Sequence, residues 1–310
     1  MARIKVVFIL GFLGSATCAQ LERANFCSEP SLAGSSSSLS ALWSRGNRQR
    51  VAECAADCYR DPRCKSFFYN TGTFICQGSS NRSMSTTDMV PGDGWVYYRY
   101  CDQDDCSDAY KYGTTDGLYT INPGSGDAKM KVSCDMRTPG GGWLVFQRRM
   151  DGSVDFSRTW DEYKKGFGYL GTEFWLGNDN IHWLTTRKAY KLRIDLADFE
   201  DNTCVSTYQQ FALADEDSFY MLSTGGYSGE CQDSFTYGNG RNFTTLDRDN
   251  DAHASNCGAI YPSGWWFGSC HSSQLNGQYN NTNYASGVCW SRWKGYYYSL
   301  RFSEMKIQPV

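Results

Sequence analysis

The sequence has few prolines, a small net charge and few extended apolar segments, and each of these shortages excludes a class of protein. Proline occurs 7 times beside 31 glycines in 310 residues, which excludes a collagen-like stalk. The 30 Lys and Arg nearly balance the 33 Asp and Glu, whereas a nucleic-acid surface normally needs a basic patch. Beyond the N-terminus, no apolar run approaches the ~20 residues that span a bilayer. We therefore expect a folded chain with no transmembrane segment and no nucleic-acid partner.

The short motifs of common enzyme classes are also missing. The chain holds 3 histidines, which are His182, His253 and His271, and it contains no HExxH, GxSxG or GxxxxGKS sequence. The zinc-protease, serine-hydrolase and phosphate-loop interpretations therefore have no residues to support them. We expect a binding protein and not an enzyme.

Cysteine and aromatic residues are abundant instead. Aromatics make up 15% of the chain, which indicates a folded protein, and 14 cysteines indicate an oxidising compartment. At the N-terminus, Arg3 and Lys5 precede an apolar stretch and a small-residue site that ends at Ala19, the pattern of a secretory signal peptide. We expect residues 1–19 to be removed and the protein to be secreted. Removal of Cys18 leaves 13 of the 14 cysteines, an odd number.

Three sequences fit the N-glycosylation sequon, and they begin at Asn81, Asn242 and Asn280. The sequon is short and arises often by chance, so its weight comes from the signal peptide. Because secretion is expected, we expect glycans at these three positions.

The remaining cysteines divide the chain in two. Six fall between Cys27 and Cys101, and seven lie at wider spacing from Cys106 to Cys289. A small segment needs disulfides because it cannot bury a large core, whereas about 205 residues can. Acidic residues without apolar neighbours separate the two groups. We therefore expect one domain at residues 20–101 and a second at residues 102–310.

Within the first group, residues 50–59 have helical spacing, with Cys54 and Cys58 on one face, and residues 64–69 (CKSFFY) have the pattern of a strand. Sequence alone leaves the disulfide pairing open, and the spacing also fits a zinc site, although such sites belong mainly to reducing compartments. The two-cysteine helix, CKSFFY and the later Cys76 resemble the PAN/apple domain. That resemblance implies a module that binds proteins or sugars. It also implies three bridges: Cys27–Cys101, Cys54–Cys76 and Cys58–Cys64.

The larger region is rich in β-forming residues and turns. Residues 189–196 alternate apolar and polar side chains, as a half-buried strand does. Residues 207–213 and 218–223 predict a hairpin, and residues 160–165 and 181–185 predict short helices. Together with the first group, this mixture predicts an α+β fold.

Acidic residues alternate along one segment of this region. Asp247, Asp249 and Asp251 are two positions apart, so their oxygens can converge on a hard cation such as Ca2+. Ala252 and Gly258 stand where an EF-hand needs Gly and Glu, so the segment is not an EF-hand. A solvated acidic turn is the alternative.

Residues 257–298 are the most aromatic part of the chain. Sugar sites combine aromatic walls with a few placed polar groups, which makes this segment a candidate. The alternative is that most of these rings are core. We expect burial of Trp265, Trp266 and Phe267, because a continuous run of large apolar residues is more often buried than displayed.

Ordered motifs then give this region a specific resemblance. The motifs are GGGW at 140–143, VFQRR at 145–149, DGSVDF at 151–156, EFWLGN at 173–178, WWFGSCH at 265–271, LNG at 275–277 and YSLRFSEMKI at 298–307. From about Cys106 to Val310 the chain is identified as a member of the fibrinogen C-terminal domain family, whose relatives include ficolins, tachylectins, angiopoietins and fibrinogen. The resemblance implies a central antiparallel sheet with short helices and long loops.

The resemblance implies the bridges Cys106–Cys134 and Cys257–Cys270. Cys204 and Cys231 lie outside that shared pair and can link neighbouring strands beside the hairpin. Cys289 is then left over, either buried and inert or available to bridge two copies in a homo-oligomer. The collagen stalk of ficolins is absent here, so their route to multivalency is absent as well.

The resemblance also implies a calcium site in the acidic segment. By this comparison, the carboxylates of Asp249 and Asp251 ligate one Ca2+, and the main-chain carbonyls of His253 and Ser255 complete the set. Asp247 is expected to support the loop without ligating. Two acids predict weak affinity, in the extracellular range of ~10⁻⁴–10⁻³ M.

Beside the calcium loop, lectins of this family hold an acetyl group in a small apolar slot. The walls of that slot map onto Tyr261, His271, Tyr284 and Ala285. The main-chain N–H groups of Cys270 and His271 are expected to bind the acetyl carbonyl. Lectin relatives hold the peptide bond before this cysteine in the cis form, which implies a cis Ser269–Cys270 bond here. Ser269 stands where ficolins carry Asn and tachylectin carries Arg.

Two functions compete for this chain. The leading hypothesis is a secreted, calcium-dependent lectin that recognises acetylated glycans, including those on microbial surfaces, in innate immune pattern recognition. The alternative is a secreted receptor-binding or adhesion ligand of the angiopoietin or fibrinogen type, which needs no sugar. An acetyl-sized aromatic pocket discriminates the two, because a receptor ligand need not keep one.

Overall fold

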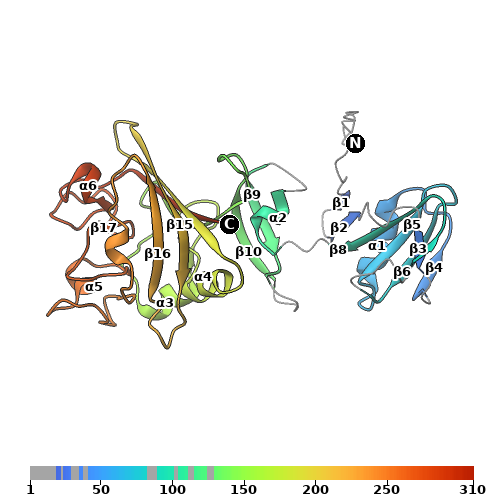
Figure 1. Cartoon of the computed structure of the whole chain (residues 1–310), viewed down its shortest axis with the longest axis horizontal. Helices are drawn as coiled ribbons and strands as arrows, with labels where there is room; N and C mark the ends of the chain where they lie inside the picture. The colour runs from blue at the N-terminus through green and yellow to red at the C-terminus, as the bar shows by residue number, and fades with distance from the viewer. Residues whose placement is uncertain are drawn as a thin grey trace. The chain divides into compact units, whose positions relative to one another are not determined.

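The computed structural model describes residues 19–21, 24–28, 35–37, 41–81, 89–100, 104–110, 115–123 and 129–310. Within it the chain separates into two compact units, Met1–Asp102 and Gln103–Val310. The elements of each unit are labelled in Figure 1. The predicted signal peptide, residues 1–19, lies outside the described residues except for Ala19.

The smaller unit is a six-stranded antiparallel sheet with one helix, α1 (Val51–Arg60). Its strands lie in the order β1, β2, β8, β5, β6, β4. Their bounds are β1 Ala19–Leu21, β2 Ala24–Ser28, β4 Trp43–Arg45, β5 Ser66–Asn70, β6 Ile75–Ser79 and β8 Trp95–Tyr100. A separate pair consists of β3 (Ser35–Ser37) and β7 (Met89–Pro91). The helix and the strand predicted from residues 50–59 and 64–69 are both present, each displaced by one or two residues.

Disulfides connect α1 to the sheet. Cys54 and Cys58 lie on its buried face, as their spacing predicts. Cys54 pairs with Cys76 in β6, and Cys58 pairs with Cys64 just before β5. Both pairs match the PAN/apple resemblance and replace the zinc interpretation. The predicted Cys27–Cys101 bridge lies outside the described residues, because Cys101 is not among them.

The larger unit is built on a nine-stranded antiparallel sheet. The main order is β12, β13, β11, β19, β14, β15, β16, and β10 and β9 extend from β11. The strands are β9 Gly117–Ile121, β10 Met130–Asp135, β11 Trp143–Arg149, β12 Phe167–Gly168, β13 Phe174–Trp175, β14 Tyr190–Ala197, β15 Thr203–Leu213, β16 Leu222–Gly229 and β19 Phe302–Pro309. The C-terminal strand β19 thus lies in the middle of the sheet. This arrangement confirms the predicted α+β fold with a central antiparallel sheet.

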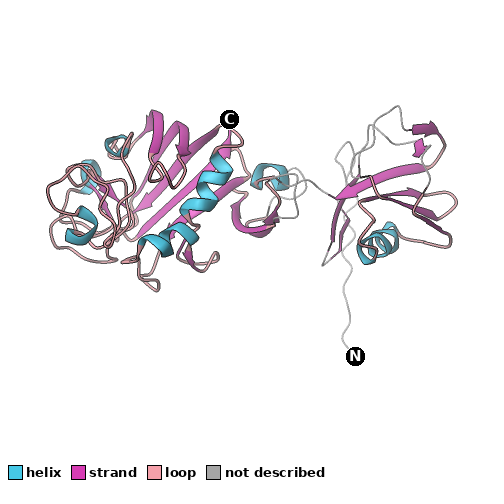
Figure 2. Cartoon of the chain, turned by 90° about the horizontal axis from the view of Figure 1, so that it is seen from below, coloured by secondary structure: helices cyan, strands magenta, loops and turns pink. Residues whose placement is uncertain are grey.

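Short helices lie against this sheet or in the loops around it (Figure 2). They are α2 Cys106–Tyr110, α3 Trp160–Lys165, α4 Asn178–Thr185, α5 Cys257–Ile260, α6 Ser291–Lys294 and the 3-10 helix η3 Thr236–Gly238. Helix α3 begins where the sequence predicts, because Thr159 and Glu162 form a capping box. Helix α4 packs on β15 and begins three residues before the predicted residue 181. Among the described residues, no helix has the length and apolar character that crossing a bilayer requires.

The hairpin of β15 and β16 corrects one prediction. Residues 218–223 were expected to form its second strand, but β16 begins at Leu222. Phe219 and Tyr220 adopt positive φ angles of 54° and 47°, which interrupts an extended strand. Tyr220 is fully buried and its hydroxyl donates to Asp179 of α4. Burial of this ring therefore lengthens the turn at the expense of the strand.

Aromatic rings fill the core of the larger unit. Trp265, Trp266 and Phe267 are at most 2% exposed, which confirms the predicted burial of this run. Trp266 contacts Trp175 of β13 and Phe243, with ring centroids 6.1 and 5.3 Å apart. The rings thus anchor the long C-terminal loops to the sheet.

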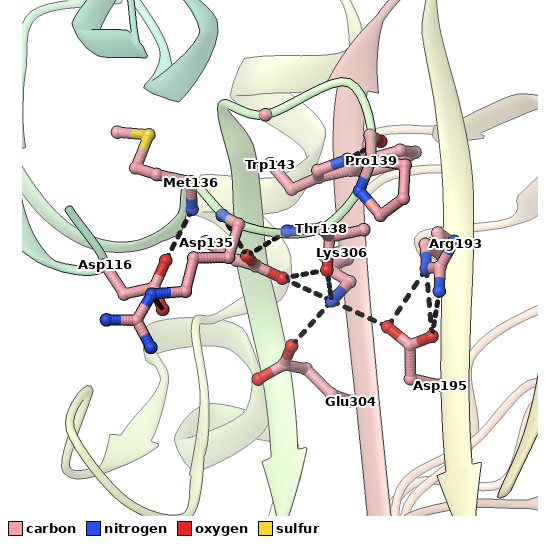
Figure 3. Close-up of polar contacts among 12 residues, drawn as sticks. Asp116, Asp135, Met136, Thr138, Pro139, Trp143, Arg193, Asp195, Glu304 and Lys306 are labelled. Carbon is pink, nitrogen blue, oxygen red and sulfur yellow. Dashed lines mark hydrogen bonds and ion pairs between the residues drawn. The ribbon is translucent and has the colours of Figure 1, made fainter. Parts of the chain in front are cut away.

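A charged cluster joins four strands of the sheet, and its centre at Lys306 is drawn in Figure 3. Lys306 of β19 is 3% exposed, and its Nζ lies 2.5 Å from Asp135, 2.6 Å from Asp195 and 3.0 Å from Glu304. Arg148 and Arg193 complete the charge balance by pairing with Glu304 and Asp195. Burial alone would raise the pKa of the Asp135 carboxyl, but hydrogen bonds from Lys306 and Thr138 outweigh it and lower this pKa to about 2. We call these residues the Lys306 cluster.

Candidate functional site

The candidate site lies in the long loops between β16 and β19. These loops hold α5, α6 and the short pair β17 (Ser273–Gln274) and β18 (Cys289–Trp290). The Cys257–Cys270 disulfide joins the acidic segment to the aromatic one, as the fibrinogen resemblance implies. The Ala252 N–H also donates to the Gly268 carbonyl, at 3.2 Å. The two predicted sites are therefore in direct contact.

Within the acidic loop, the three aspartates have different roles. Asp247 accepts hydrogen bonds from the Trp160 N–H and the Thr245 hydroxyl, both at 2.8 Å, as expected of a supporting residue. Asp251 accepts the main-chain N–H groups of His253 and Cys257, at 2.8 and 2.9 Å. Its burial raises the pKa of this carboxyl. A cation beside the loop would therefore favour the ionised form of Asp251.

The donor atoms of this loop fit Ca2+. Asp249 is exposed and accepts one hydrogen bond, from the Asp251 N–H at 3.3 Å, and the remaining expected donors are main-chain oxygens. Hard oxygen ligands of this kind suit Ca2+. The His253 ring and the sulfurs of Cys257 and Cys270 also lie within 4.8 Å of one another. Those two sulfurs form a disulfide and cannot act as thiolate ligands, so the group does not make a zinc site.

His271 is the centre of the aromatic part of the site. Its side chain is buried, and among the described residues neither ring nitrogen has a hydrogen-bond partner. The ring lies near the main chain of Ala285 without reaching hydrogen-bond geometry. Burial lowers the pKa of the imidazole to about 4, so the ring is neutral at physiological pH. A neutral imidazole has one donor and one acceptor nitrogen, and here both are unsatisfied.

Aromatic rings surround His271, and we call the set the aromatic cluster. Ring centroids of Tyr261, Phe267 and Tyr296 lie 5.0, 5.6 and 6.2 Å from the imidazole. Tyr284 is half exposed and joins the cluster through Tyr296, at 5.3 Å. The cluster consists of Tyr261, Phe267, His271, Tyr284, Ala285 and Tyr296.

Ala285 belongs to the cluster through a main-chain hydrogen bond to Tyr296. It is buried, has a φ of 58°, and its N–H donates to the Tyr296 carbonyl at 2.7 Å. All four predicted wall residues thus belong to one cluster: Tyr261 contacts His271, and His271, Tyr284 and Ala285 each contact Tyr296. The place of Tyr296 in the cluster is not predictable from the sequence, because a run of three tyrosines carries no signal for which one faces inward.

The backbone before His271 differs from the expectation. The resemblance implies a cis Ser269–Cys270 bond, but the described residues contain no cis peptide bond. The chain turns instead through a positive φ of 53° at Cys270 and a hydrogen bond from the Gly268 N–H to the Cys270 carbonyl. The Tyr237 hydroxyl accepts the Ser269 N–H at 3.0 Å and holds the turn. Within the described residues, the N–H groups of Cys270 and His271 donate no hydrogen bond.

The remaining predictions for the larger unit concern two further disulfides and the leftover Cys289. Cys106–Cys134 and Cys204–Cys231 are joined, the latter between β15 and the segment after β16. Within the described ranges Cys289 is unpaired, its side chain is fully buried, and burial raises the pKa of its thiol to about 12. The structure thus favours the inert alternative for Cys289 over a bridge between copies.

The three predicted glycosylation residues differ in exposure. Asn81 and Asn280 are exposed, whereas Asn242 is half buried. Thr244, the third residue of the Asn242 sequon, is fully buried. Glycosylation stays a prediction at all three positions.

In this geometry, a disulfide links an acidic loop to the turn before a buried imidazole that lies among aromatic rings. The chain belongs to the fibrinogen C-terminal domain family: the family model for the C-terminal globular domain of fibrinogen beta and gamma chains matches residues 102–310. A PAN domain model matches residues 32–103. Both resemblances noted in the sequence are therefore confirmed.

Curated relatives resemble the larger unit. Human Fibrinogen C domain-containing protein 1 is 50% identical over 203 residues, which cover 63% of this chain and 44% of the relative. Ryncolin-4 of Cerberus rynchops is 49% identical over 209 residues, which cover 66% of this chain and 60% of the relative. The chain thus spans about half the length of these two proteins.

Among solved structures, a lamprey fibrin D-dimer in complex with the peptide Gly-His-Arg-Pro-amide has the same fold. It is 36% identical to this chain, with a TM-score of 0.63, and the match covers 66% of this chain and 73% of the other.

Proposed function

We propose that this chain is a secreted, calcium-dependent lectin that binds acetylated glycans, such as those on microbial surfaces, through the aromatic cluster. The observation that carries the proposal is His271. A buried polar group without a partner costs about 1–3 kcal/mol of stability, so native proteins rarely keep one without a reason. A ligand that bonds to this imidazole supplies such a reason.

An acetamido group has the matching chemistry. Its methyl is apolar and suits contact with the rings of Tyr261 and Tyr296 and with the Ala285 methyl. Its carbonyl accepts hydrogen bonds, for which the main-chain N–H groups of Cys270 and His271 have no competing partner. The imidazole of His271 offers a further donor or acceptor. Small, neutral groups with one apolar end and one polar end therefore fit the cluster.

Calcium is proposed to act on the same site through the loop that precedes it. Asp249 and Asp251, with the carbonyls of His253 and Ser255, would hold the ion, whose charge would stabilise the clustered acceptors. The loop is bonded to the turn before His271 by the Cys257–Cys270 disulfide and the Ala252–Gly268 hydrogen bond. Loss of the ion is therefore expected to loosen the turn that presents the Cys270 and His271 N–H groups.

The second candidate is a receptor-binding or adhesion ligand without sugar binding. The lamprey fibrin D-dimer favours it, because a protein that contains this fold is in complex with a peptide there. The aromatic cluster favours the lectin, because the four residues implied by lectin relatives lie in one cluster and one of them, His271, has an unsatisfied imidazole.

The proposal is tested by retention on an acetylated resin in Ca2+. We expect the wild-type chain to be retained and to elute with free N-acetylglucosamine or with EDTA. His271→Ala and Tyr284→Ala should each lose retention on the resin. Both variants should stay folded, with an unfolding temperature close to that of the wild type. Tyr169→Ala removes a tyrosine that is 76% exposed on the loop between β12 and β13, and it should behave as wild type. Retention of both cluster variants would contradict the proposal and favour the receptor-ligand function.

A further inference from the structure

Three consecutive tyrosines follow Gly295, and they lie in three different environments. The Tyr296 hydroxyl donates to the His271 carbonyl at 3.2 Å, so this ring belongs to the aromatic cluster. The Tyr298 hydroxyl donates to the Glu200 carboxylate at 2.7 Å, away from the cluster. Tyr297, between them, is 69% exposed. Its position in the chain places it beside the candidate site without making it part of that site.

The ring of Tyr297 contacts Tyr284 at the outer side of the cluster. The two ring centroids are 5.2 Å apart, with an interplanar angle of 60°. Tyr284 in turn contacts Tyr296, which contacts His271. The contacting rings therefore form a series in space. It begins at the buried imidazole, passes through the half-exposed Tyr284 and ends at the mostly exposed Tyr297.

The backbone beneath Tyr297 is fixed by its neighbours. The Gly295 N–H donates to the Ser291 carbonyl at 3.0 Å, and the Tyr296 carbonyl accepts the Ala285 N–H at 2.7 Å. The Tyr297 hydroxyl, by contrast, makes no hydrogen bond within the described residues. A mostly exposed ring adds little burial to the fold, so its position is held by contacts that do not depend on the ring itself.

We propose that Tyr297 and the exposed part of Tyr284 form a second sugar subsite beside the aromatic cluster. This subsite would take the next residue of an acetylated oligosaccharide whose terminal acetamido sugar occupies the cluster. Aromatic faces suit sugars because one side of a sugar ring presents C–H groups that pack on them. The ligand class is a neutral acetylated oligosaccharide of two or more sugars. The inference rests on the proposed lectin function and names the length of glycan that the site prefers.

The test compares sugar length by titration calorimetry in Ca2+, with N-acetylglucosamine and its β-1,4-linked dimer and trimer as probes. We expect the wild type to bind the dimer and trimer about five-fold more tightly than the monosaccharide, as a single aromatic contact allows. Tyr297→Ala should lose this gain and keep the monosaccharide affinity. Tyr297→Phe should keep the gain, because the ring and not the hydroxyl makes the contact.

Tyr169→Ala is the matched control, because it removes another exposed tyrosine of the same unit and should leave both affinities unchanged. Equal wild-type affinity for the three sugars would overturn the second subsite, as would a length-dependent gain that survives in Tyr297→Ala. Either result leaves the lectin function standing. A wild type that binds none of the three sugars contradicts the proposed function itself.

Discussion

Two buried polar groups of the larger unit differ in whether their polar atoms are bonded. Lys306 is 3% exposed and has three carboxylates within 3.0 Å, each supported by further bonds. His271 is 7% exposed, and in the part of the chain that the structure describes neither ring nitrogen has a hydrogen-bond partner. A fully bonded buried charge fixes strands in register and serves the fold. A buried group left without a bond weakens the fold, and its retention points to a role outside folding.

The Lys306 cluster should give the largest effect when it is broken. Lys306→Met keeps the length of the side chain but leaves Asp135, Asp195 and Glu304 without their shared cation. We expect a loss of about 3–5 kcal/mol in the free energy of unfolding, as for other buried charges that lose a partner. Guanidinium denaturation measures it. Lys131→Met, at an exposed lysine of β10, should change stability by less than about 0.5 kcal/mol, and an equal effect of the two variants would contradict this account.

Lowering the pH should destabilise the fold in two separate ranges, first through His271 and then through Asp135. The folded-state pKa of His271 is about 4, below its ordinary 6.5, so its neutral form stabilises the fold fully above pH 6.5. That contribution is lost as pH falls from 6.5 to about 4, by about 3 kcal/mol at most. The folded-state pKa of Asp135 is about 2, below its ordinary 3.8, so its contribution is lost only between pH 3.8 and 2.

Urea denaturation at a series of pH values measures both losses. His271→Phe should flatten the dependence between pH 6.5 and 4, and Asp135→Asn should flatten it below pH 3.8. A wild-type and a His271→Phe curve that stay parallel through the upper window would show that His271 titrates normally.

Calcium should have a smaller effect on stability. At about ten times a Kd near 10⁻³ M, one bound ion adds about 1.4 kcal/mol to the free energy of unfolding. The Asp249→Asn/Asp251→Asn double variant should lose this increment and any heat of calcium binding. Asp161→Asn, at an acid that is 67% exposed on α3, is the matched control. An undiminished calcium titration in the double variant would move the ion to another site.

The smallest effect on stability is expected at His271 itself. His271→Phe replaces an unsatisfied ring by an apolar one, so near pH 7 the free energy of unfolding should stay within about 1 kcal/mol of wild type or rise. The same variant should lose retention on acetylated resin. This contrast with Lys306→Met is the sharpest form of the comparison, and a loss of 3 kcal/mol or more near pH 7 would break it.

Local signals in the sequence were sufficient for several elements. The alternation in β14 and the cysteine spacing in α1 each act over a few positions, and the structure contains both elements. The run Trp265–Phe267 was also recognisable as core, because three large apolar residues in succession leave no polar face.

Long-range features were not accessible in this way. Lys306 meets Asp135 across 171 positions, and only the strand order of β10, β11, β19 and β14 brings their side chains together. The Phe219 and Tyr220 turn depends on burial of Tyr220 against α4, and the inward position of Tyr296 depends on its bonds to His271 and Ala285. Strand pairing and side-chain burial decide these features, and the spacing of neighbouring residues in the sequence predicts neither.

The central claim is that the aromatic cluster recognises an acetyl group. Its most direct test is titration calorimetry of the full chain in Ca2+ with N-acetylglucosamine and, separately, with glucosamine, which lacks the acetyl group. The account predicts that glucosamine binds at least about ten-fold more weakly, and that Tyr284→Ala weakens N-acetylglucosamine binding by a similar factor while remaining folded. Equal affinity for the two sugars, or unchanged N-acetylglucosamine affinity in folded Tyr284→Ala, would contradict it.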